Sequence, residues 1–115
     1  MNIKDFMEIQ NAFDEKHGWS NSDSKTTVDT IEQLKNDIVG LVGEVGEFSN
    51  IVKKVSRESA KEKTNSFENN IENMNEELVD IFIYLLRIMT TLDIDLEKEY
   101  TKKLEFNKRR FKKFE

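Results

Sequence analysis

The chain has 115 residues, a formal net charge of −5 at pH 7 and no cysteine. This length suits one domain over 1–115, the acidic balance argues against general nucleic-acid binding, and the lack of cysteine excludes disulfides and thiolate zinc sites. The chain has no apolar run near the roughly 20 residues that span a bilayer and no signal-peptide pattern at its start. We therefore expect a cytoplasmic protein with neither a membrane nor a nucleic acid as partner.

An all-α fold is predicted because proline is absent and only four glycines are present, so strands would lack turn residues. The first helix is expected over 3–16, where apolar residues recur at helical spacing. Gly18 follows its end, as is typical of helix C-termini. A polar loop is predicted over 21–27.

The second helix is expected to begin at Val28 or Thr30 and to end at Ser56. Glu44 and Glu47 fall on a flank of its predicted core stripe, which comprises Ile31, Leu34, Ile38, Leu41, Val45, Phe48, Val52 and Val55. Three glycines interrupt this helix at a cost of roughly 1 kcal/mol each. We expect them to allow the close approach of another backbone or a ligand: Gly40, Gly43 and Gly46.

The charged segment 57–70 is predicted to be a mobile linker. The third helix is expected to begin between Ser66 and Ile71 and to end near Leu92. It is apolar on nearly every face, which predicts burial on several sides. Its predicted core stripe is Ile71, Met74, Leu78, Ile81, Leu85, Ile88 and Leu92. The fourth helix is expected over 95–114, with four residues facing inward: Leu96, Tyr100, Leu104 and Phe111.

Two acidic pairs lie inside the most apolar stretches, Glu44 with Glu47 and Glu77 with Asp80. Residues three apart share a helix face, but such pairs are no more frequent here than the acidic composition predicts, so their apolar setting is the informative feature. One interpretation is that both pairs are solvated helix edges. The other is that they face each other, raise one another's pKa and bind a divalent cation.

Carboxylate ligands favour Mg²⁺, with Mn²⁺ as a substitute, over zinc. A di-iron site in a helical bundle would need a Glu-x-x-His motif on its helices. The single histidine, His17, lies outside the predicted acidic helices, so a di-iron site is excluded.

The segments 41–47 (Leu-Val-Gly-Glu-Val-Gly-Glu) and 77–85 (Glu-Leu-Val-Asp-Ile-Phe-Ile-Tyr-Leu) resemble the MazG-like all-α nucleoside triphosphate pyrophosphohydrolases. The likeness is greatest to the small dCTP pyrophosphatase-like branch. The closing Lys-Asn-Arg pattern of that branch is matched by Lys103, Asn107 and Arg110, and its aromatic-ended segment by 13–19, which ends in Trp19.

The resemblance implies a four-helix MazG-like bundle completed by dimerisation, often as a dimer of dimers. It implies Mg²⁺-dependent cleavage of a nucleoside triphosphate between the α and β phosphates, to a monophosphate and pyrophosphate, in nucleotide-pool house-cleaning. The catalytic and metal-binding residues would be Glu44, Glu47, Glu77 and Asp80, one of the glutamates preparing the attacking water.

The substrate-binding residues are expected on two helices and a loop. Lys103, Asn107 and Arg110 share one helix face, which can present donors to phosphate oxygens; the alternative is a solvated basic helix end. Trp19 is expected either to stack on the base or to pack under the loop. Tyr84 is expected either to contact the sugar or base or to be a core tyrosine.

Two alternative functions remain at this stage. The first keeps the chemistry but changes the substrate to dUTP or phosphoribosyl-ATP. The second is a non-catalytic helical interaction module, for which magnesium would neither stabilise the fold nor support turnover. The preferred base, the number of metal ions and the choice between dimer and tetramer stay open.

Overall fold

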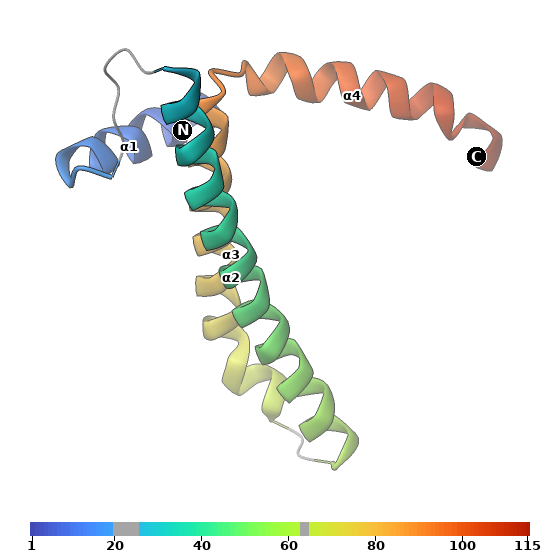
Figure 1. Ribbon diagram of the computed structural model, residues 1–115. Coiled ribbons are helices and arrows are strands. Elements are labelled where there is room, and N and C mark those ends of the chain that lie inside the picture. Colours follow the sequence, from blue (N-terminus) through green and yellow to red (C-terminus); the bar gives the residue numbers. More distant parts are fainter. Residues whose placement is uncertain (20–25, 63–64) are drawn as a thin grey trace.

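The computed structural model describes residues 1–19, 26–62 and 65–115 (Figure 1). The helices in these ranges are α1 (Ile3–Lys16), α2 (Thr27–Ala60), α3 (Ser66–Thr91), α4 (Leu96–Arg110) and a 3₁₀ helix, η1 (Lys112–Phe114). The described residues contain no strand, which confirms the all-α prediction. None of the described helices combines the length and the apolarity that a membrane crossing requires.

Local side-chain chemistry explains where the first two helices begin and end. At the start of α1, Asn2 and Asp5 form a capping box, in which each side chain accepts a hydrogen bond from the other residue's backbone N–H. Thr26 and Asp29 form the same arrangement at the start of α2. Gly18 has a φ of 73° just after the end of α1, which confirms the predicted stop.

The predicted linker over 57–70 is wrong, because most of that segment is helical. Helix α2 continues to Ala60 and α3 already begins at Ser66. The Ser66 hydroxyl donates to the Glu58 carboxylate at 2.6 Å and so ties the two helix ends together. The fourth helix also ends earlier than expected, at Arg110. Of the predicted polar loop, 21–25 lie outside the described residues.

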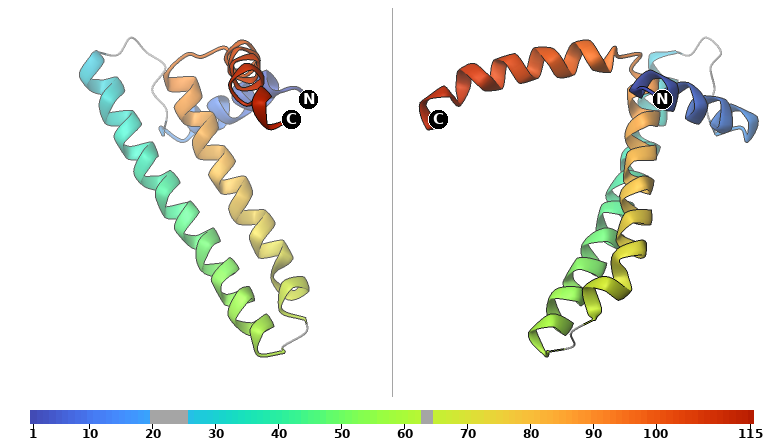
Figure 2. Two further views of the ribbon diagram at one scale, coloured as in Figure 1. Left: turned by 90° about the vertical axis from the view of Figure 1, so that its right-hand side faces the viewer. Right: turned by 180° about the vertical axis from the view of Figure 1, so that it is seen from behind.

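Helices α2 and α3 form a long antiparallel hairpin (Figures 1 and 2). The positions that face the partner helix recur at spacings of three or four residues, as in a coiled coil. We call these positions the inner stripes; on α2 they are Leu34, Asp37, Leu41, Glu44, Phe48, Ile51 and Val55, and on α3 Ser66, Asn70, Met74, Glu77, Ile81, Tyr84 and Ile88. The prediction that Glu44 flanks the core stripe is therefore wrong, because Glu44 lies in the stripe.

A second apolar stripe on each helix is exposed in the single chain, and we call these the outer stripes. They comprise Val28, Ile31, Ile38, Val42, Val45 and Val52 on α2, and Ile71, Leu78 and Leu85 on α3 with Leu92 just after its end. The predicted core stripes combined residues of the inner and outer stripes. Among the described residues only three apolar side chains are buried, with at most 9% of their surface exposed: Val55, Met74 and Leu86.

The other two helices leave the same end of the hairpin on opposite sides (Figure 2). Helix α1 packs on α3, where the rings of Phe6 and Phe82 meet edge to face at 5.9 Å. Helix α4 contacts α1 and then projects away from the hairpin (Figure 1). The predicted inward face of α4 is therefore wrong for the single chain: Tyr100 is 64% exposed.

The four helices of one chain do not close into a bundle. A compact domain of this length has a radius of gyration of about 13 Å, whereas this chain has 18.2 Å. The predicted four-helix bundle is thus absent within one chain, and its predicted completion by a second copy stays a prediction.

Candidate metal centre

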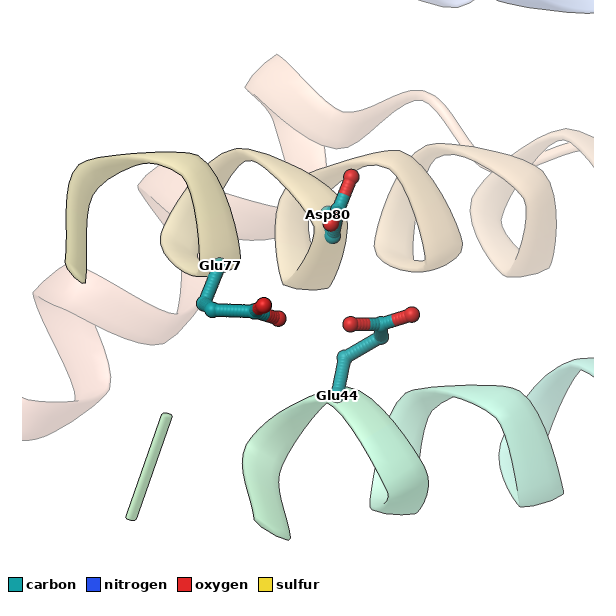
Figure 3. Close-up of side chains that lie close together, drawn as sticks. All are labelled: Glu44, Glu77 and Asp80. Atoms are coloured by element: carbon teal, nitrogen blue, oxygen red, sulfur yellow. The ribbon is translucent and has the colours of Figure 1, made fainter. Parts of the chain in front are cut away.

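Three carboxylates converge between α2 and α3. Glu44 comes from α2, and Glu77 and Asp80 come from successive turns of α3. One carboxylate oxygen of each lies within 4.8 Å of those of the other two. Figure 3 shows Glu77 extending into the space between the helices toward Glu44. The coiled-coil register produces this meeting, because Glu44 and Glu77 both occupy inner-stripe positions.

The fourth predicted ligand, Glu47, lies one turn beyond Glu44 and is exposed. It is not a member of the converging group of three, but it acts on that group electrostatically. The neighbouring Glu44 side chain is the main cause that raises the pKa of Glu77 from 4.5 to about 7, with burial and the neighbouring Glu47 as further causes. Glu77 and Glu44 therefore repel each other when both are ionised.

Two oxygen atoms of this group are buried without a partner. Glu44 Oε2 and Glu77 Oε2 accept no hydrogen bond from any described residue. A buried carboxylate oxygen without a donor is unfavourable, and a bound cation would satisfy both atoms at once. The donor set consists of carboxylate oxygens alone, which fits Mg²⁺ or Mn²⁺. The residues present thus suit the predicted metal.

A cavity of about 330 Å³ adjoins the carboxylates between α1, α2 and α3. It brings together acidic, aromatic and cationic side chains. Its lining residues are Gln10, Phe13, Glu44, Asp80, Ile83, Tyr84 and Arg87. The cavity therefore connects the carboxylate group to a mixed apolar and polar surface on α1 and α3.

Both predicted aromatic residues lie beside this cavity. Tyr84 lines it, and the Tyr84 ring packs directly against α2 at Gly40. The predicted approach of another backbone is not found at any of the three glycines: a side chain, Tyr84, lies against Gly40, and nothing lies within 4 Å of a Cβ placed on Gly43 or Gly46. Trp19 is 54% exposed, and the Arg87 guanidinium lies 5.7 Å from its ring centroid.

The predicted phosphate-binding residues of α4 are not brought to the carboxylates within one chain. Lys103 and Arg110 do share a face, since their cationic groups lie 4.9 and 5.8 Å from the centroid of the Phe106 ring. Asn107 lies on the same helix and is half-buried. Helix α4, however, leads away from the hairpin that carries Glu44 and Asp80 (Figure 1).

An ion pair between α1 and α3, largely shielded from solvent, was not predicted from the sequence. Arg87 donates from Nε and Nη2 to the two Asp14 oxygens at 2.9 and 3.0 Å. Burial lowers the pKa of Arg87, but the hydrogen bonds and charge of Asp14 outweigh it and raise the pKa. One signal was available: Arg87 is the single cation in the apolar run 78–92, on the face of Asp80 and Tyr84.

The chain matches no protein-family model, no curated protein and no solved structure. The likeness to the MazG-like superfamily therefore rests on the sequence motifs. Within the structure, a function can be inferred from the geometry of the carboxylates and of the adjoining cavity.

Proposed function

We propose that this protein is a Mg²⁺-dependent nucleoside triphosphate pyrophosphohydrolase of the MazG-like superfamily, with Mn²⁺ as a substitute metal. The observation that carries the proposal is the convergence of Glu44, Glu77 and Asp80 with two buried oxygens that lack hydrogen-bond donors. Such a group is unfavourable by itself and becomes useful when it binds a divalent cation.

In this proposal Glu44, Glu77 and Asp80 hold the metal, and Glu47 joins them as the fourth carboxylate. A bound Mg²⁺ supplies charge neutralisation at the phosphate oxygens and lowers the pKa of a bound water. One of the glutamates orients the attacking water and accepts its proton. The bond cleaved lies between the α and β phosphates, and the products are a nucleoside monophosphate and pyrophosphate.

The cavity gives the substrate a place next to the carboxylates. Tyr84 lines it, and Trp19 stands beside it with half of its surface exposed. An aromatic face stacks on any nucleobase, so these two residues suit the nucleoside part of the substrate. We expect dCTP-like or modified deoxynucleotides as substrates, in keeping with a house-cleaning role.

The outer stripes support a homodimer. They expose apolar side chains at regular spacing along most of the hairpin, and burial of apolar surface is the main driving force of association. A second hairpin packed on them completes a four-helix core, and two such dimers make a tetramer. In that assembly the basic face of α4, with Lys103, Asn107 and Arg110, reaches a triphosphate from a neighbouring copy.

The test is to incubate the protein with each nucleoside triphosphate and Mg²⁺ and to measure pyrophosphate and orthophosphate separately. We expect pyrophosphate from at least one substrate, and its loss in the variants Glu44→Gln and Asp80→Asn. Glu76→Gln is the matched control, since Glu76 is exposed on α3 beside Glu77. Orthophosphate as the first product contradicts the proposed bond, and no turnover with any substrate contradicts the enzyme assignment.

A further inference from the structure

A buried carboxylate, Asp14, is hydrogen-bonded to two residues that line the cavity, Gln10 and Arg87. Asp14 is 1% exposed and accepts three hydrogen bonds, two from Arg87 and one from Gln10 Nε2 at 2.9 Å. Its oxygens are therefore occupied and hidden from solvent. Asp14 can serve neither as a metal ligand nor as a proton acceptor for a substrate, so its role is to hold Arg87.

Arg87 retains hydrogen-bond donors after this pairing. A guanidinium has five N–H groups, and the bonds to Asp14 use one on Nε and one on Nη2. The remaining N–H groups have no partner among the described residues, and Arg87 lines the cavity. The Tyr84 and Trp19 rings lie 5.0 and 5.7 Å from its guanidinium carbon, which restricts the guanidinium plane further.

We propose that Arg87 contacts the nucleobase of the substrate, its free N–H groups donating to acceptor atoms of the base, and that Asp14 positions it. This inference rests on the proposed pyrophosphohydrolase function. It assigns recognition of the base to Arg87, a residue that lies outside the sequence motifs.

Two observations favour the base over the phosphates as the group that Arg87 contacts. First, Asp14 neutralises the charge of Arg87, so the pair offers directed hydrogen bonds rather than a free cation. Second, Arg87 lies two turns, or about 10 Å, beyond Asp80 along α3. In the proposed function the phosphates lie beside the metal-binding carboxylates, so the nucleoside lies at the end of the cavity that Arg87 lines.

Gln10 adds the complementary hydrogen-bonding group. Its amide nitrogen donates to Asp14, so its carbonyl oxygen points away from that carboxylate and remains an acceptor on a residue that lines the same cavity. Donors on Arg87 and an acceptor on Gln10 together match the mixed donor and acceptor edge of a nucleobase.

The decisive variant is Arg87→Lys, which keeps a cation for Asp14 but loses the planar set of spare donors. Arg57→Lys on the exposed surface of α2 is the matched control. KM and kcat are measured for each of the four deoxynucleoside triphosphates, together with inhibition by inorganic triphosphate, which carries no base. The melting temperature of each variant reports whether it folds.

We expect Arg87→Lys to raise KM for the preferred nucleotide about tenfold or more and to weaken the preference among bases. Inhibition by inorganic triphosphate stays within about twofold of wild type, because the phosphate end is untouched. Asp14→Asn keeps the side-chain shape but loses the charge, so we expect a rise in KM with kcat retained.

Four results overturn the inference in whole or in part. An unchanged KM and base preference in Arg87→Lys shows that Arg87 does not contact the base. An equal loss of affinity for inorganic triphosphate shows that it contacts phosphate; in both cases the pyrophosphohydrolase function stands. No hydrolysis by the wild-type protein overturns that function and this inference together. A fall in kcat without a rise in KM in Asp14→Asn contradicts the positioning role of Asp14.

Discussion

The ring of Tyr84 lies directly against α2 at Gly40, in space that a Cβ on residue 40 would occupy. Any residue with a Cβ at this position would force the Tyr84 ring to shift. Because Tyr84 also forms a wall of the cavity, the glycine sets the shape of the candidate substrate site as well as the helix packing.

Gly40→Ala is expected to lower the free energy of unfolding by about 1 to 3 kcal/mol, because the added methyl group displaces the Tyr84 ring. Gly43→Ala is the matched control: it has open space around the new methyl group and gains up to about 1 kcal/mol from helix propensity. Denaturant unfolding of both variants checks this. Equal effects of the two substitutions contradict the proposed packing of Tyr84.

The stability of the metal-free protein is expected to fall as the pH rises from about 5 to about 8. The cause is Glu77, because the neighbouring Glu44 carboxylate raises its pKa to about 7. The folded state then binds this proton more tightly than the unfolded state. The free energy of unfolding therefore falls as the pH rises from 4.5 to about 7. Mg²⁺ is expected to reverse the loss. Melting temperatures measured across this pH range with and without Mg²⁺ check both expectations.

Two variants isolate the contribution of Glu77 to this pH dependence. Glu77→Gln removes the titrating group, so its melting temperature should depend less on pH and respond less to Mg²⁺. Glu76→Gln, which changes an exposed neighbour, should behave like wild type. The same pH profile in all three proteins contradicts the assigned role of Glu77.

Removing one partner of the Asp14–Arg87 pair is expected to destabilise the protein strongly. Asp14→Ala leaves Arg87, whose side chain is only 18% exposed, without its counter-charge, and we expect a loss of roughly 3 kcal/mol. Lys35→Ala disrupts an exposed ion pair with Glu32 and should change stability by less than about 1 kcal/mol. Chemical denaturation compares the two, and a loss in Asp14→Ala no greater than in Lys35→Ala contradicts the structural role of the pair.

The outer stripes predict self-association. Val45→Lys places a charge in the middle of the α2 outer stripe and should convert a dimer or tetramer into smaller species, with loss of the proposed activity. Val39→Lys is the control, since Val39 is exposed but lies outside that stripe. Light scattering during size-exclusion chromatography checks this, and a monomeric wild-type protein contradicts the proposed dimer.

Much of the helical architecture was predictable because apolar periodicity and a few caps define it locally. The position of Gly18 predicted the end of α1, and the absence of proline favoured long helices. The segment 57–70 was misread because it is polar on nearly every face. Its helical turns lie near the tip of the hairpin, where a hydrogen bond from the Ser66 hydroxyl to the Glu58 carboxylate joins α2 to α3.

The candidate site was only partly predictable. Glu44, Glu77 and Asp80 stood out by their apolar setting, and the fold brings them together. Asp14 and Arg87 are 73 residues apart, so only the tertiary structure joins them. The register of Glu44 was misjudged because α2 carries two apolar stripes, and the sequence pattern alone does not separate the one buried within the chain from the one left exposed.

The most direct measurement of the proposed function is a ³¹P NMR spectrum of the protein incubated with the four deoxynucleoside triphosphates, one at a time, and Mg²⁺. We expect that for at least one substrate the three triphosphate resonances give way to those of a nucleoside monophosphate and pyrophosphate in equal amounts, and that EDTA stops the conversion. Triphosphate resonances that persist for every substrate, or a nucleoside diphosphate with orthophosphate instead, would contradict it.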